Sequence, residues 1–308
     1  MSDYFSLDIG QSIRSENGVW YKNIQTLGHG GNAITFLALA TSGDARGVLF
    51  AIKVFRKLSQ PARRDAFIEE IKFLRVADHP SVMRIYDAGI FVRHSGTNTF
   101  EYPFVAAEYL PKTLAVVIRE NTSSLAEKVS YSLQLLSVLR YLALQDRPVI
   151  HRDIKPQNIF VKGGSCVLGD FGLMKFLDGD DAVDRDILKE SELPGMPFYY
   201  RTPDLISYAR AQTGITMKSD VFQLGLVLTE LFTGWNSAQR PNDILDDIIL
   251  DPIKHIGGNF GGGIAALLHR MLELNPDDRV SAEDIMGGWQ GVFDDITSKS
   301  HELEGRVF

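Results

Sequence analysis

The sequence predicts an α+β protein with two lobes, a β-rich lobe followed by a larger and mostly helical one. Segments rich in β-branched and aromatic residues, punctuated by glycine, fill residues 20–27, 34–40 and 48–55. A long amphipathic pattern over residues 124–145 opens a region in which helical periodicity dominates. The chain has 308 residues, enough for each lobe to bury a hydrophobic core of its own.

The other expected elements follow the same periodic patterns. A helix is expected over residues 61–77, where apolar residues recur at helical spacing after a proline. We divide the chain into a β-rich lobe over residues 1–109, a helical lobe over 110–293 and a polar tail over 294–308. Further strands are expected at residues 82–92, 102–109, 159–161 and 166–169, and further helices at 203–210, 219–233, 244–250, 263–273 and 281–287.

Composition and charge are those of an ordinary globular protein and weigh against two kinds of partner. Hydrophobic residues make up 44% of the chain and charged residues 23%. The net charge is -7, so the chain lacks the dense Lys and Arg that nucleic acids and anionic membranes attract, and we expect neither as a partner. The most apolar stretch, residues 221–232, is short and contains polar residues, so we expect no membrane span.

The single cysteine and the first residues indicate the compartment. One cysteine, Cys166, cannot form an intramolecular disulfide, which is typical of a reducing environment. It lies in an apolar, strand-like run, so we expect a buried and inert thiol. Residues 1–10 lack the basic-then-apolar pattern of a secretory signal. The expected location is therefore cytoplasmic.

A glycine-rich segment, Gly28 to Ala33, lies between two expected strands. Glycines let the backbone approach phosphate oxygens closely and offer N–H donors to them. Taken alone, the segment is explained equally well as a hairpin turn. A dinucleotide-binding fingerprint is disfavoured, because there a helix rather than a strand follows the glycines.

A lysine in an apolar strand, Lys53, is followed by Glu70 on the next expected helix. If Lys53 points inward it must find an anion, because an unpaired buried charge is costly. Glu70 could hold it there and let it reach phosphate oxygens. The alternative is a surface lysine on an edge strand and a solvated glutamate.

The strongest local pattern is the polar segment from His151 to Asn158, between a long helix and a short strand. Asp153 can accept the proton of an incoming hydroxyl, and Lys155 can neutralise phosphate charge. Asn158 offers an oxygen to a metal ion and can also orient Asp153. A second carboxylate, Asp170, follows the next strand within Asp-Phe-Gly and can hold a Mg²⁺ ion that bridges phosphates.

In this order the motifs resemble the eukaryotic-type (Hanks-type) Ser/Thr protein kinase catalytic domain, over roughly residues 25–287. The resemblance implies a bilobal fold with a small antiparallel β lobe carrying one main helix. It also implies transfer of the γ-phosphoryl group of ATP, with Mg²⁺ or alternatively Mn²⁺, to Ser or Thr hydroxyls of protein substrates. The implied residues are Asp153, Lys155, Lys53 and Glu70 for catalysis; Asn158 and Asp170 for the metal; and Leu27, Gly28, His29, Gly30, Gly31, Asn32, Ala33, Thr35, Ala51, Lys53, Ala107, Glu108, Leu110 and Phe160 for the nucleotide.

The same resemblance extends to anchors in the second lobe. Asp220 would hold the backbone of the segment that carries Asp153, and Arg279 would pair with Asp204. A small-molecule phosphotransferase of the related antibiotic or choline kinase type generally lacks the Asp204–Arg279 pair, so that alternative is disfavoured.

Some positions depart from the family pattern. Ala33 stands in place of a third glycine, and Ala107, which would guard the pocket behind adenine, is small enough to predict an enlarged pocket. Neither Met196 nor Pro197 can supply the threonine hydroxyl that commonly bridges the catalytic Asp and Lys. A nucleotide-binding pseudokinase scaffold therefore remains an alternative.

Arg152, next to the expected catalytic base, often meets a phosphate in such kinases. Ser191 is the only Ser or Thr between Asp170 and Gly195, so one hypothesis is autophosphorylation of Ser191, whose phosphate could order the loop through bonds to Arg152. Glu190 or Glu192 could pair with Arg152 instead and make the kinase constitutively competent. The third interpretation is a solvated acidic loop with no partner.

Overall fold

The computed structural model describes residues 5–30, 32–179, 184–185, 199–243 and 245–304. Contacts divide these residues into two units. The N-terminal unit comprises residues 5–78 and 82–111, and the C-terminal unit comprises 79–81 and the described residues from 112 onward. The first unit is an antiparallel sheet with a helix and the second is mostly helical, so the predicted α+β class is confirmed.

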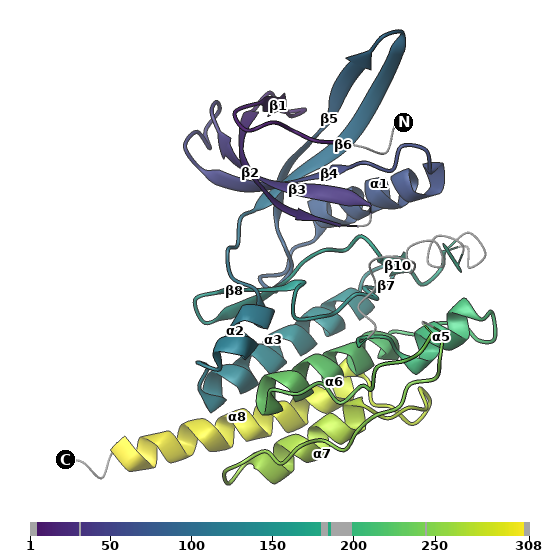
Figure 1. The fold of residues 1–308 in the computed structure, drawn as a ribbon. Helices are drawn as coiled ribbons and strands as arrows, with labels where there is room; N and C mark the ends of the chain where they lie inside the picture. Colours follow the sequence, from purple (N-terminus) through teal and green to yellow (C-terminus); the bar gives the residue numbers. More distant parts are fainter. Residues whose placement is uncertain (1–4, 31, 180–183, 186–198, 244, 305–308) are drawn as a thin grey trace. The chain divides into compact units, whose positions relative to one another are not determined.

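A six-stranded antiparallel sheet forms the N-terminal unit, with strand order β1-β2-β3-β4-β6-β5. Helix α1, Pro61–Val76, lies beside this sheet in Figure 1, with proline in its first turn. The strands are β1 (Ser12–Arg14), β2 (Trp20–His29), β3 (Ala33–Ala40), β4 (Leu49–Phe55), β5 (Ile85–Ser95) and β6 (Asn98–Glu108).

The hairpin of β5 and β6 is longer than the sequence predicted. Ser95 pairs with Asn98, so that only two residues connect the strands, which we expected to end at residue 92 and to begin again at residue 102. Gly96, with φ of +60°, takes the first of these two positions, where a left-handed conformation lets a tight turn match the twist of its strands.

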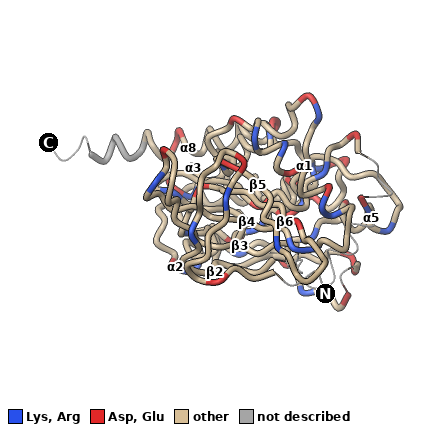
Figure 2. Tube along the Cα trace, turned by 90° about the horizontal axis from the view of Figure 1, so that it is seen from above, with Lys and Arg blue, Asp and Glu red and all other residues tan. Residues whose placement is uncertain are grey.

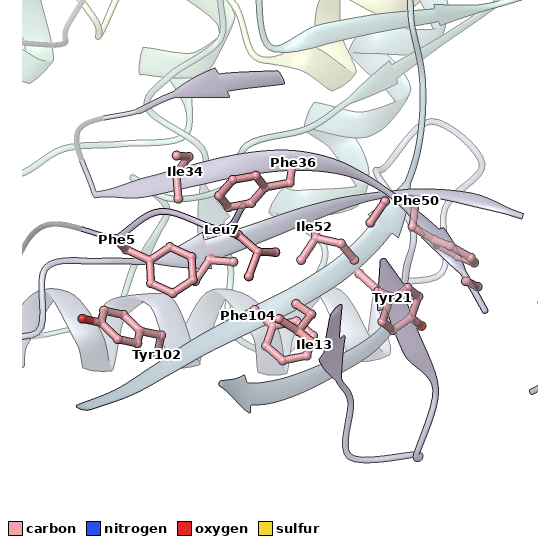
Figure 3. Packing of buried hydrophobic residues seen from close by; sticks show 14 residues of the cluster. Phe5, Leu7, Ile13, Tyr21, Ile34, Phe36, Phe50, Ile52, Tyr102 and Phe104 are labelled. Carbon is pink, nitrogen blue, oxygen red and sulfur yellow. The ribbon is translucent and has the colours of Figure 1, made fainter. Parts of the chain in front are cut away.

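Residues that precede the predicted strands form part of the core. Phe5 and Leu7 are 2% and 5% exposed, and the short strand β1 adds Ile13 to the same apolar cluster. Figure 3 shows Phe5 beside Tyr102, with ring centroids 4.6 Å apart, and Phe36 of β3 above them. Sequence reasoning missed this segment because its apolar residues are too few and too widely spaced to form a periodic pattern.

Replacement of Phe5 by alanine should therefore destabilise the N-terminal unit. The ring contacts Phe36, Phe91 and Tyr102, and its loss leaves a cavity that costs about 3–5 kcal/mol. Urea unfolding would measure the change. Ile9→Ala is the matched control, because Ile9 is 79% exposed and its loss should change stability by less than about 0.5 kcal/mol. Equal stabilities for the two variants would contradict the packing described.

Helices dominate the C-terminal unit. The long helix α3 (Leu125–Ala143) begins with a capping box, in which the side chains of Ser124 and Glu127 bond each other's backbone N–H groups. Helix α8 (Ala282–Glu304) packs along α3 and contacts α7 (Gly261–Met271) (Figure 1). The other elements are α2 (Leu114–Glu120), α5 (Pro203–Ala209), α6 (Lys218–Thr233), β7 (Val149–Ile150), β8 (Ile159–Lys162), β9 (Ser165–Leu168) and β10 (Lys175–Phe176).

The helix expected over residues 244–250 is absent from its described part, residues 245–250, which form a turn and a bridge between Ala238 and Leu250. The side chains of Asp243 and Asp246 accept hydrogen bonds from nearby backbone N–H groups at 2.7–2.9 Å. Further along, the N–H of Gln239 donates to the carbonyl of Ile249 at 2.9 Å and the N–H of Asp251 donates to the carbonyl of Ser237 at 2.7 Å. The end of the segment therefore pairs with residues 237–239 instead of forming a helix.

Helix α8 extends well beyond its predicted end at residue 287 and through most of the segment expected to be a polar tail. Trp289 and Ile296 are 0% and 8% exposed, so the buried stripe continues past that point. Gly288 belongs to this contact, because a Cβ atom there would lie 2.5 Å from a methyl carbon of Leu267. Gly288 thus permits close packing of α8 against α7.

Two surface properties bear on partners. Basic and acidic residues are interspersed along the traces of both units in Figure 2. Within the described part of the chain, no helix is both long and apolar enough to cross a membrane.

Cys166 is completely buried, and burial raises the pKa of its thiol to about 12, as expected for an inert cysteine.

Candidate active site

The glycine-rich segment is the turn between β2 and β3 in the N-terminal unit. The N–H of Gly30 donates to the carbonyl of Ala33 at 2.8 Å, and the guanidinium of Arg63 contacts the side chain of Asn32. A Cβ atom at Gly28 would meet nothing within 4 Å, so the backbone there is open. His29 is exposed. Gly31 lies outside the described residues.

Lys53 of β4 and Glu70 of α1 form the ion pair that the sequence suggested. Their N–O distance is 2.7 Å, and the side chains are 19% and 4% exposed. The Lys53 ammonium also lies 5.7 Å from the ring centroid of Phe67. Lys53 is therefore held inside the unit rather than on its surface.

The residues expected around adenine fall in both units. Within the N-terminal unit, sheet pairing sets Ala51 opposite Ala107 and Thr35 opposite Lys53. Leu110 is buried, and the N–H of Glu108 donates to the carbonyl of Arg84 at 3.0 Å. Leu27 is 40% exposed at the end of β2. Phe160 belongs to the C-terminal unit, where it forms a bridge with Thr113.

Helix α6 holds the backbone of the segment that carries Asp153. Both carboxylate oxygens of Asp220 accept backbone N–H bonds, from His151 at 2.7 Å and from Arg152 at 2.9 Å. Arg152 takes a left-handed conformation with φ of +64°, which is uncommon for a residue with a side chain. The fully buried Asp220 thus fixes the backbone immediately before Asp153, as predicted.

Asp153 is the centre of a small hydrogen-bonded group. Its Oδ2 atom accepts bonds from Lys155 Nζ at 2.9 Å and from Asn158 Nδ2 at 2.8 Å. Burial is the main cause that raises the pKa of Asp153 to about 6; Lys155 opposes this shift and the Asp170 carboxylate adds to it, within that net value. No donor contacts Oδ1 among the described residues, so that oxygen can accept a proton from a substrate hydroxyl.

Asn158 and Asp170 offer the kind of oxygen ligands that Mg²⁺ prefers. Asn158 uses its Nδ2 atom on the carboxylate and carbonyl of Asp153, which leaves its amide oxygen outside those bonds. Asp170 is exposed, and its charge contributes to the raised pKa of Asp153. Mg²⁺ bound with ATP completes its shell with phosphate oxygens and water, and such a donor set fits it.

Sequence reasoning missed Gln223, which connects the catalytic segment with the residues near α5. Its Oε1 atom accepts the N–H of Ile154 at 2.9 Å. Its Nε2 atom donates to the carbonyls of Arg152 and Tyr200 at 2.9 and 2.8 Å. The available signal was a glutamine within an apolar helix, because a buried amide must find partners.

The predicted partners of Arg152, Glu190 and Glu192, lie outside the described residues, as does Ser191. The described carboxylate at Arg152 belongs to Asp184 instead, with distances of 2.6 and 2.9 Å. No sequence pattern distinguishes Asp184 from the other acidic residues between 178 and 192, because pairing across 32 positions depends on the tertiary fold.

The predicted pair of Asp204 and Arg279 is also present. One terminal nitrogen of Arg279 lies 2.9 Å from each carboxylate oxygen, and both side chains are almost fully buried. The start of α5 is fixed further by Thr202, whose hydroxyl accepts the N–H of Leu205 and contacts Ser219 at 2.7 Å.

Comparisons with known proteins agree with this arrangement. Residues 21–288 match the family model described as protein kinase domain. The probable serine/threonine-protein kinase nek3 of Dictyostelium discoideum is 30% identical over 278 residues, which cover 86% of this chain and 23% of the relative. Serine/threonine-protein kinase Nek2 of Homo sapiens is 29% identical over 244 residues, covering 73% of this chain and 49% of the relative. Serine/threonine-protein kinase Nek9 of Xenopus laevis is 26% identical over 300 residues, covering 92% of this chain and 29% of the relative. The chain thus spans less than half the length of each of these relatives.

Proposed function

This chain belongs to the protein kinase domain family, and we propose that it is an active serine/threonine protein kinase. It would transfer the γ-phosphoryl group of ATP to Ser or Thr hydroxyls of protein substrates. The observation that carries this proposal is the Asp153 carboxylate, which is held through one oxygen by Lys155 and Asn158 while the other is left for a hydroxyl proton. The names of the curated relatives support the choice of Ser and Thr.

Each group has a role that its geometry supports. Lys53, fixed by Glu70, would bind phosphate oxygens of the nucleotide, above which the open backbone at Gly28 would lie. Bound Mg²⁺, or Mn²⁺ in its place, would be held by Asn158 and Asp170 and would neutralise phosphate charge. Asp153 would orient the substrate hydroxyl and take its proton as the phosphoryl group leaves ATP. Since such catalysis is mostly positioning and electrostatics, preformed contacts of this kind support activity.

The two alternatives are less well supported. A pseudokinase scaffold typically loses one of the groups above, whereas Lys53, Asp153, Asn158 and Asp170 are all retained. A small-molecule phosphotransferase would have no need of the buried Asp204–Arg279 pair.

The test is transfer of label from γ-labelled ATP with Mg²⁺ to generic basic proteins and to the chain itself. Lys53→Met should lower kcat/KM by about 10²-fold or more, because it removes a cation aimed at the phosphates. Lys72→Met is the matched control on α1, since Lys72 is 66% exposed and pairs with the exposed Glu69. Label on Ser or Thr that depends on Lys53 supports the proposal. Absence of label, with nucleotide still bound, would favour the scaffold.

A further inference from the structure

Arg152 is a buried cation next to the proposed catalytic base. The residue is 2% exposed and immediately precedes Asp153. A guanidinium keeps its charge at all ordinary pH values, so a buried one needs an anion and hydrogen-bond acceptors around it. What supplies that anion therefore decides how firmly the catalytic segment is held.

Asp184 supplies it through two parallel contacts. Nη1 of Arg152 lies 2.6 Å from one carboxylate oxygen and Nη2 lies 2.9 Å from the other, which is the bidentate geometry of strong Arg–carboxylate pairs. The Asp184 side chain is 16% exposed. The hydroxyl of Tyr208, a fully buried residue of α5, donates to Asp184 at 2.8 Å. Asp184 is thus held by Arg152, from the segment that carries Asp153, and by Tyr208 of α5.

The remaining donors of Arg152 reach the backbone that follows Asp170. Nε donates to the carbonyl of Leu173 at 2.6 Å, and Nη2 lies 3.4 Å from the carbonyl of Met174. One guanidinium therefore connects the residue before Asp153 with the residues just after the proposed metal ligand.

We propose that Asp184 is a positioning residue that holds Arg152, and through it Asp153 and the backbone after Asp170, in the arrangement needed for phosphoryl transfer. A carboxylate at this position supplies the negative charge that a phosphorylated serine would otherwise bring to Arg152. The kinase is consequently competent without phosphorylation of the segment between residues 171 and 194. This inference rests on the proposed kinase function.

The experiment compares phosphatase-treated wild type with Asp184→Asn and Asp184→Glu, in the full chain and with mass spectrometry to establish the absence of phosphate. Asp184→Asn keeps the shape of the side chain but removes its charge. The value of kcat should fall by about 10²-fold, because a small displacement of Asp153 slows the chemical step. The KM for ATP should stay within about threefold, because Asp184 touches no substrate in this proposal. Asp184→Glu restores the charge and should recover part of kcat.

Two controls separate positioning from a general loss of structure. Asp178→Asn removes an acid of the same segment whose partner is the exposed Arg147, and its kcat should equal that of wild type. Arg152→Met combined with Asp184→Asn leaves no buried unpaired charge, so this protein should fold. It should transfer phosphate no more slowly than Arg152→Met alone, since coupled residues are not additive. The unfolding midpoints of wild type, Arg152→Met, Asp184→Asn and the double variant should show the same coupling, independently of activity.

The outcomes distinguish a failure of the role proposed for Asp184 from a failure of the proposed kinase function. Activity of dephosphorylated wild type that is lost in Asp184→Asn and partly restored in Asp184→Glu supports the inference. Wild type that is active only after phosphorylation overturns it, as does an Asp184→Asn protein with unchanged kcat. Wild type that is inactive in both forms overturns the proposed function and the inference with it.

Discussion

Replacement of Asp153 by asparagine is expected to slow phosphoryl transfer by about 10²–10⁴-fold while nucleotide binding persists. Asparagine has the same shape, and its oxygen can still accept the bonds that Lys155 and Asn158 now donate to Asp153. The amide cannot take a proton from the substrate hydroxyl. The loss should therefore appear in the chemical step and leave the folded structure unchanged.

The measurement is a single-turnover assay with γ-labelled ATP, accompanied by a thermal-shift titration with Mg-ATP. Asp146→Asn is the matched control, because Asp146 is exposed in the same unit, seven positions earlier in the chain. Its rate should equal that of wild type. An Asp153→Asn protein that retains a tenth of the wild-type rate would show that Asp153 is not the base.

The second large effect concerns stability. Arg279→Met leaves the Asp204 carboxylate buried without its cation and is expected to cost about 3–5 kcal/mol of the free energy of unfolding. Arg279 and Asp204 are 0% and 2% exposed in their side chains. Arg279 also donates to the carbonyls of Lys218 and Glu273 at 2.8 Å, and both would lose a donor.

Urea unfolding would measure this difference. Arg140→Met is the control, because Arg140 and Glu283 form an ion pair with side chains 48% and 64% exposed, and its loss should cost less than about 1 kcal/mol. In the double variant Arg279→Met/Asp204→Leu, no buried charge is left unpaired, so part of the lost stability should return. Equal effects of Arg279→Met and Arg140→Met would contradict the role given to burial.

Short-range patterns predicted the elements that carry most of the site. Asp153, Lys155 and Asn158 lie within six residues of one another, so the order of residue types largely determines their contacts. The pairing of Lys53 with Glu70 was one of two alternatives, and only the burial of both side chains decided between them. The anchors Asp220 and Arg279 came from the resemblance to a family rather than from periodicity.

Residues whose roles depend on distant partners could not be predicted in this way. Gln223 bonds the backbone some 70 positions earlier in the chain. Its place in an apolar helix signals that it needs partners, but nothing near it in the sequence identifies them. Residues 245–250 have helix-like apolar spacing, but the end of this segment pairs with residues 237–239 instead, as in the bond from the N–H of Gln239 to the carbonyl of Ile249. In both cases a contact with another segment of the chain, which the hydrophobic pattern does not encode, determines the local structure.

The burial of Phe5 has a practical consequence for where this domain can be cut. The family match begins at residue 21, but the apolar cluster of the N-terminal unit includes Phe5, Leu7 and Ile13, which precede it. A protein shortened to the matched boundary would expose the faces of Phe36 and Tyr102 against which Phe5 now packs, and would be prone to self-association. Truncations should therefore keep the segment from Phe5 to Arg14.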